Sequence, residues 1–259
     1  MKKILVIPDR ENIEESLSLA NEYNLGFEYN DFFSPDVLDD EQLESDIIKD
    51  YKAHELPCYT TVHGAFVDVI PFSMDKKVKE VSLLRINQSI ECARKIGASA
   101  VVFHLNYNPF LNSEAYVDGF IKQNIEIWKN ILNDNKYVNI FIENMFEKDY
   151  FVIQKIAEAL NEYENFGVCL DWAHASLSDV EPQKWAEALG RYIKHIHIND
   201  NDLKSDLHLS LGDGKIDRFA FYDCYKKYMS EATVLIETKS IENQKKSLEQ
   251  LKTDGALDD

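Results

Sequence analysis

Short apolar runs, rich in Val, Ile and Phe, alternate along the chain with longer amphipathic stretches. The runs have the length and composition of buried strands. We expect strands at the following positions: Ile4–Ile7, Gly26–Tyr29, Cys58–His63, Ala100–His104, Asn139–Glu143, Phe166–Asp171, Ile193–Ile198 and Val234–Glu237. A strand followed each time by a helical stretch is the pattern of a parallel sheet covered by helices.

The clearest helical pattern lies between the third and fourth expected strands. Leu83, Ile86, Ile90 and Ala93 recur at intervals of three and four residues, and Gly97 follows as a helix stop. The remaining helices are expected near residues 12–23, 41–53, 114–133, 149–163, 183–190, 217–229 and 241–252. No linker or long repeat interrupts the alternation. Eight strand-helix units predict an α/β protein with a single (β/α)8 TIM barrel domain over residues 1–259.

Composition and charge narrow the class of protein. The chain of 259 residues is 45% hydrophobic, which supplies a sizeable core. Its net charge of −18 opposes binding to phosphate backbones and anionic membranes, so we expect no nucleic-acid or membrane partner. The apolar stretch Ile4–Pro8 is too short for a signal peptide or a membrane span, and we expect a cytoplasmic protein. The scattered cysteines are expected to be buried, reduced thiols: Cys58, Cys92, Cys169 and Cys224.

Potential metal ligands stand at or next to the ends of six successive strands. They are His63, His104, Glu143, Asp171, His197 and Glu237. A lone buried His or Glu is usually structural, but carboxyl strand ends meet on one face of a barrel, so the recurrence predicts one shared site. Imidazole and carboxylate ligands without thiolate suit Zn²⁺ or Mn²⁺, and an oxygen-rich set also suits Mg²⁺. We therefore expect Glu143, Asp171, His197 and Glu237 to hold one of these ions.

Further polar residues lie close to these strand ends. Asp171-Trp172-Ala173-His174 and Asp206-Leu207-His208 bring His174, Asp206 and His208 to the same end, where they would hold a second ion or bind substrate. Glu28, near the end of the second strand, would reach substrate or form a structural salt bridge. His195 is expected to point toward the helix layer, away from the site.

Several segments together resemble the xylose isomerase-like TIM barrel superfamily, which includes sugar phosphate isomerases and epimerases and the endonuclease IV-like proteins of AP endonuclease family 2. The resemblance extends in order over nearly the whole chain, and its most specific parts are Asp-x-x-His, His-x-Asn-Asp and Asp-x-His-x-x-Leu-Gly-x-Gly. The segments are Val62–Phe66, Val102–His104, Ile142–Asn144, Cys169–His174, His197–Asp200 and Asp206–Gly214.

The two branches of the superfamily imply different sites. The endonuclease IV pattern implies three ions, held by three sets of residues: His63, His104 and Glu143; Glu143, Asp171, His197 and Glu237; His174, Asp206 and His208. The epimerase pattern implies one ion on the second set, with His63, His104 and His174 facing substrate. In that branch Trp172 would stack on a sugar, although packing on a neighbouring loop is an equal alternative. The resemblance thus implies one to three divalent ions.

Charge favours the epimerase branch. The expected loops at residues 64–75, 105–113 and 172–183 contain no Lys or Arg, so they offer little to a duplex. The cations expected near the rim, Arg10, Lys148, Lys204, Lys215 and Lys239, would serve one phosphate group at most. We therefore expect a metal-dependent isomerase or epimerase acting on a small sugar, sugar phosphate or related polyol by enediolate proton transfer.

In this interpretation Glu143 and Glu237 transfer the proton as base and acid. Three alternatives remain open. One is an endonuclease IV-like zinc phosphodiesterase, another is a lyase or dehydratase, and the third is a ligand binder without catalysis. Nothing in the sequence indicates the oligomeric state.

Overall fold

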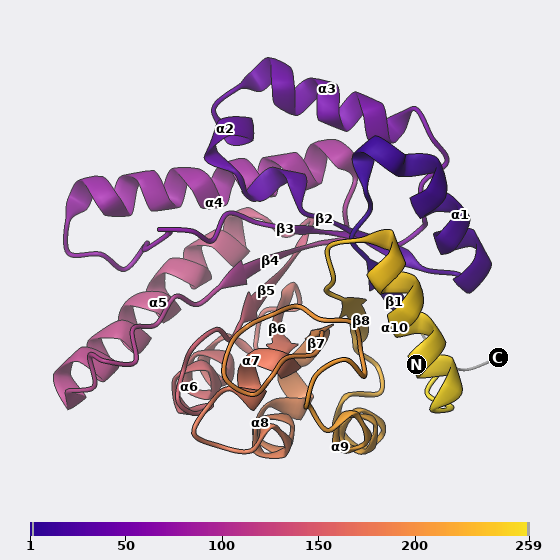
Figure 1. Ribbon diagram of the computed structural model, residues 1–259. Helices are drawn as coiled ribbons and strands as arrows, with labels where there is room; N and C mark the ends of the chain where they lie inside the picture. Colours follow the sequence, from indigo (N-terminus) through magenta and orange to yellow (C-terminus); the bar gives the residue numbers. More distant parts are fainter. Residues whose placement is uncertain (2, 258–259) are drawn as a thin grey trace.

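The computed structural model describes Met1 and residues 3–257, while Lys2, Asp258 and Asp259 of the predicted domain lie outside the described residues. In the described part, eight parallel strands close into a barrel in sequence order, and β1 pairs with β8 (Figure 1). The strands are β1 (Ile4–Val6), β2 (Gly26–Tyr29), β3 (Thr60–His63), β4 (Ala100–His104), β5 (Asn139–Glu143), β6 (Phe166–Asp171), β7 (Ile193–Ile198) and β8 (Thr233–Ile236). This architecture confirms the predicted (β/α)8 TIM barrel.

Helices surround the barrel on its outer side (Figure 1). They are α1 (Ile13–Tyr23), α2 (Pro35–Leu38), α3 (Glu41–Lys52), α4 (Lys76–Ile96), α5 (Glu114–Asp134), α6 (Phe151–Leu160), α7 (Trp172–Ser176), α8 (Pro182–Leu189), α9 (Arg218–Cys224) and α10 (Ile241–Thr253). Three 3-10 helices and one π-helix complete the described elements: Arg10–Asn12, Asp31–Phe33, Gly190–Tyr192 and Tyr225–Met229. The N-terminal amine donates to the Ala256 carbonyl at 2.7 Å, which joins the two ends of the chain.

Helix α4 illustrates how sequence signals fix the outer layer. Its start is capped by the Asp75 carboxylate, which accepts from the backbone amides of Lys77 and Val78. Its end is Gly97, whose φ of +88° lies in the left-handed region that favours glycine. Ile86 and Ile90 are buried against the barrel, as their spacing predicts. The helix begins earlier than the apolar pattern alone indicates because the cap at Asp75 defines its first turn.

Some boundaries and smaller features differ from the prediction. β3 begins at Thr60 rather than Cys58, and Cys58 is exposed, whereas the other three cysteines are buried as expected. The short helices α2 and α7 were not predicted because four or five residues are too few to establish a helical repeat. Within the described residues, the structure contains no helix long and apolar enough to cross a membrane.

The barrel interior contains a small apolar cluster as well as polar residues, which include those at the carboxyl strand ends. Ala100, Val102, Phe141 and Cys169 form a buried cluster separate from the larger core between strands and helices. Residues two positions further along the same strands, such as His104 and Glu143, face the same interior because strand side chains alternate with a period of two. The strand period therefore brings the polar residues together at one end.

Candidate metal centre

Glu143 lies at the centre of a group of histidines. Its Oε2 is 3.2 Å from His104 Nε2 and 3.6 Å from His63 Nε2, so the ends of β3, β4 and β5 meet at this carboxylate. Its Oε1 is 3.2 Å from His197 Nδ1 on β7. His63, His104 and Glu143 each offer one potential ligand atom, and these atoms lie within 4.8 Å of one another.

The predicted four-residue set converges on the same region. Asp171, Glu143 and His197 form a second group whose ligand atoms lie within 4.8 Å of one another. Glu237 follows β8 directly, and its Oε2 is 3.6 Å from His197 Nδ1. The neighbouring strands set this geometry, since the backbone registers pair His104 with Glu143 and Asp171 with His197.

The third predicted set also assembles. Asp206 Oδ2 is 3.4 Å from His174 Nε2 and 3.0 Å from His208 Nε2. The Nδ1 atoms of the two histidines face backbone oxygens instead, at 2.9 Å from Asn144 O for His174 and 3.1 Å from Glu237 O for His208. A proton on Nδ1 would satisfy each carbonyl and leave Nε2 free as a ligand. His208 adopts a φ of +50°, a left-handed conformation that is strained for a residue other than glycine.

Unpaired buried atoms in this cluster fit a metal ion. Both Glu143 carboxylate oxygens, Asp171 Oδ2, His197 Nδ1 and Glu237 Oε2 are buried and have no hydrogen-bond partner among the described residues. His197 Nδ1 lies 3.2 Å from Glu143 Oε1 and 3.6 Å from Glu237 Oε2, and both are contacts without hydrogen-bond alignment. Two ligands at about 2.0–2.1 Å from a tetrahedral ion would lie roughly 3.4 Å apart. The cluster is able to hold a divalent metal ion.

The electrostatics of the cluster also favour a cation. Burial opposes ionisation of Glu143, but His197 and His104 outweigh it and hold the pKa of Glu143 well below its ordinary value. For Glu237, burial is the larger influence and raises the pKa. The ion-pair partners of Glu143, Asp171, Asp206 and Glu237 are all histidines, and no described Lys or Arg pairs with them. A bound cation would compensate their charge.

Exposure changes across the cluster from its inner carboxylates to its outer edge. Glu143, Asp171 and His197 are completely buried, whereas the side chains of Asp206 and His208 are 24% and 23% exposed. The outer edge of the cluster therefore faces solvent at Asp206 and His208.

The loop that carries Asp206 and His208 is held by Asp200. The Asp200 carboxylate accepts hydrogen bonds from the backbone amides of Gly212 and Ile216, both at 3.0 Å. A Cβ atom at Gly214 would lie 2.3 Å from Asp200 Oδ1, so this position requires glycine. The Gly-x-Gly end of the motif therefore allows the loop conformation that positions Asp206 and His208.

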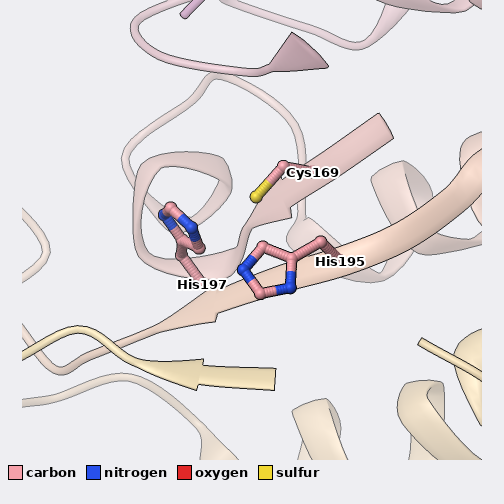
Figure 2. A group of neighbouring side chains, drawn as sticks. All are labelled: Cys169, His195 and His197. Carbon is pink, nitrogen blue, oxygen red and sulfur yellow. The ribbon is translucent and has the colours of Figure 1, made fainter. Parts of the chain in front are cut away.

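For Trp172 the structure corresponds to the packing alternative, and for His195 it corrects the expectation. Trp172 is only 2% exposed and its ring packs on Phe221 of α9, at 5.2 Å between centroids, because the chain turns into α7 directly after Asp171. It contacts the helix layer, not the metal cluster. His195 points into the barrel, on the same side of β7 as His197 (Figure 2). Residues two apart on a strand share a face, so the expectation that His195 would point outward was wrong.

The sequence interpretation left the role of one buried carboxylate, Glu28, open and did not identify another, Glu147. Glu28 is completely buried beneath the cluster and contacts both His195 and His197 rather than the solvent side. This position corresponds to the alternative in which Glu28 forms a structural salt bridge. The sequence signal for it was that Glu28 faces the barrel interior from its strand. Glu147, in the loop after β5, is 3% exposed and accepts from the Met145 amide. Burial raises the pKa of Glu147 to about 7. No spacing pattern in the sequence indicates that Glu147 is buried, because its position depends on the path of the loop after β5.

The fold and this cluster define a (β/α)8 barrel with a potential metal site at the carboxyl ends of its strands. The chain belongs to the xylose isomerase-like TIM barrel family, whose model matches residues 19–253. A related curated protein, the uncharacterized protein MJ1311 of Methanocaldococcus jannaschii, is 30% identical over 202 residues, covering 74% of this chain and 68% of that protein. The probable endonuclease 4 of Mycobacterium leprae is 27% identical over 201 residues, covering 72% and 75% of the two chains.

Solved structures support the fold independently. The TTHB071 protein from Thermus thermophilus, from a structure described as soaked with ZnCl2, matches with a TM-score of 0.77 and 23% identity over 98% of this chain and 97% of that one. A D-tagatose 3-epimerase-like protein matches with a TM-score of 0.76 and 24% identity over 97% and 96% of the two chains. At these identities the similarity establishes the shared barrel, and the reaction has to be argued from the site.

Proposed function

We propose that the protein is a metal-dependent isomerase or epimerase that acts on a small sugar, sugar phosphate or related polyol. The observation that carries the proposal is that two buried carboxylates lie close to the same atom: Glu143 Oε1 is 3.2 Å and Glu237 Oε2 is 3.6 Å from His197 Nδ1. Proton transfer next to a carbonyl needs a base and an acid close to one bound substrate. The similarity to a D-tagatose 3-epimerase-like structure supports the same class of substrate.

In this proposal Glu143, Asp171, His197 and Glu237 hold Mn²⁺, Zn²⁺ or Mg²⁺. The ion would supply Lewis-acid polarisation of a substrate carbonyl. Glu143 and Glu237 remove and return the proton on the neighbouring carbon. His63, His104 and His174, which contact Glu143 from β3, β4 and α7, bind the substrate oxygens. The chain is proposed to form one domain, since barrel elements follow each other from Ile4 to Thr253.

A screen of ketoses and ketose phosphates tests this function. Purified protein, loaded separately with Mn²⁺, Zn²⁺ or Mg²⁺, should convert at least one ketose into an epimer or an aldose, and the activity should disappear with a chelator. The products are measured by chromatography. A product with a new carbon–carbon double bond would instead identify a dehydratase. Absence of conversion with every metal, while the ligand binds, would contradict the enzyme proposal.

A second candidate is a phosphodiesterase of the endonuclease IV type. The specific observation in its favour is the convergence of His174 and His208 on one oxygen of Asp206, the three residues that the endonuclease IV pattern assigns to a third ion. The similarity to probable endonuclease 4 of Mycobacterium leprae points in the same direction. Three ions would supply positive charge for a phosphate beyond that of the few cations expected near the rim.

We expect no useful cleavage of duplex DNA that contains an abasic site. The net charge is −18, and no described Lys or Arg forms an ion pair with the cluster, so the duplex backbone finds few partners around the site. Incision is measured on a labelled abasic duplex at physiological salt with added Zn²⁺. Efficient incision, lost in a His174→Ala variant, would favour the phosphodiesterase over the epimerase.

A further inference from the structure

Beneath the candidate metal centre, a buried polar network connects His197 to the barrel interior. Glu28 on β2 supplies a carboxylate that is completely buried. Its Oε1 is 3.2 Å from His197 Nε2, and its Oε2 is 3.2 Å from His195 Nε2. Thr61 on β3 donates its hydroxyl to the same Oε2 at 2.6 Å. Glu28 therefore contacts both interior histidines of β7 from the opposite side of the barrel.

The two nitrogens of His197 face opposite groups. Nδ1 faces the candidate ligands Glu143 and Glu237, and Nε2 faces Glu28. Neither His197 Nε2 nor Glu28 Oε1 has a hydrogen-bond partner among the described residues, although both atoms are buried. At 3.2 Å the two atoms form an ion-pair contact without full hydrogen-bond alignment, and each is the complementary group that the other lacks. A buried donor and acceptor left unpaired would each cost stability.

We propose that Glu28 is a positioning residue that keeps the Nε2 proton of His197 and so presents Nδ1, as an unprotonated ligand, to the metal centre. This proposal rests on the metal site of the proposed function. A neutral imidazole carries one proton, and the nitrogen that holds it is set by the hydrogen bond it makes. A carboxylate behind a metal-bound histidine fixes both the tautomer and the ring direction, and it increases the basicity of the ligand nitrogen.

The neighbouring histidine explains why Glu28 is available for this role. His195 Nε2 contacts Glu28 Oε2, while His195 Nδ1 is 2.6 Å from the Thr233 hydroxyl on β8. Both nitrogens of His195 are therefore occupied, and the group of Cys169, His195 and His197 in Figure 2 is better explained as a support than as a further ion site. Thr61 and His195 hold Oε2 of Glu28, which leaves Oε1 directed at His197.

The test measures Zn²⁺ affinity, by competition with a chromophoric chelator, in four variants: Glu28→Gln, His197→Ala, the Glu28→Gln and His197→Ala double variant, and Glu44→Gln. Glu28→Gln should lower the affinity for the ion that His197 binds by about 10- to 100-fold. This is the usual effect of losing a residue that supports a metal ligand. The same substitution should cause no further loss in the His197→Ala background, because Glu28 acts through His197. Glu44→Gln, the matched control, changes a buried carboxylate that pairs with Lys95 at 2.7 Å in the helix layer, and it should leave the affinity unchanged.

Three results would overturn the proposal. They are an unchanged affinity in Glu28→Gln, an equal loss from Glu28→Gln in the presence and absence of His197, or a loss in Glu44→Gln as large as that in Glu28→Gln. If Glu28→Gln does not fold, as judged by its thermal transition without metal, Glu28→Asp replaces it in the same cycle. The affinity measurement uses no substrate. If the effect of Glu28→Gln depends on His197 but the sugar screen fails, only the proposed reaction is contradicted. If a sugar is turned over but the effect of Glu28→Gln does not depend on His197, only the role of Glu28 is contradicted.

Discussion

Glu237→Gln should abolish turnover of a sugar substrate while leaving the fold and much of the substrate binding intact. The amide keeps the shape of the carboxylate but cannot accept a proton. General acid–base catalysis contributes about 100- to 10,000-fold to a rate, so we expect a loss of at least about 100-fold. Turnover is measured with the ketose identified by the screen, and bound metal is determined on the same sample. The metal measurement is needed because Glu237 is also a proposed ligand.

Two further variants accompany this experiment: Glu143→Gln as a second test and Glu44→Gln as a control. Glu143→Gln should lose turnover to a similar degree, since Glu143 is the second proposed proton-transfer group. Glu44 is a buried carboxylate on α3, paired with Lys95 at 2.7 Å and part of the helix layer, so Glu44→Gln controls for loss of a buried charge. It should retain turnover. Wild-type turnover in Glu237→Gln with its metal retained would show that this carboxylate is not an essential acid or base.

The Asp171→Asn and His197→Ala double variant should lose the central ion. Both residues are completely buried and form a group of potential ligand atoms with Glu143. The double variant removes one charged ligand and one imidazole from the proposed set of four. We expect its affinity for divalent ions to fall by more than the roughly 10- to 100-fold that loss of a supporting partner typically costs. Metal content per chain after gel filtration is the measurement.

A matched double variant, Asp46→Asn and His54→Ala, carries the same two kinds of substitution outside the barrel. Asp46 lies on α3 and bonds Gln42 and Lys49, and His54 contacts Glu14. This control should bind metal like the wild type. If the Asp171 and His197 double variant also bound metal with wild-type stoichiometry, the ligand set would be misassigned.

The sequence was sufficient to predict the barrel and the residues at its carboxyl end. Strands β2, β4, β5, β6 and β7 were predicted with the observed bounds, because buried parallel strands are short, apolar and separated by helical periods. The polar residues His104, Glu143 and Asp171 interrupt that apolarity at the last position of their strands. Since parallel strands of a barrel end on one face, their convergence followed from topology alone.

Other features depend on three-dimensional paths that a sequence pattern does not encode. Asp171 caps α7 by accepting from the His174 amide, and this turn sends Trp172 into the helix layer. The contact of Glu28 with His197 joins β2 to β7 across the barrel interior, at a separation that no local spacing predicts. The direction of His195, by contrast, was available from the period of two along β7.

The most direct test of the account is solvent-deuterium incorporation by the wild-type protein. The protein is freed of metal, divided, and incubated in D2O with the ketose identified by the screen, either with Mn²⁺ or with a chelator. The account predicts that deuterium enters the carbon next to the carbonyl with the ion, and that incorporation is lost with the chelator and in Glu143→Gln. Conversion of the ketose without deuterium incorporation, or equal incorporation in the presence of the chelator, would contradict metal-dependent proton transfer by these carboxylates.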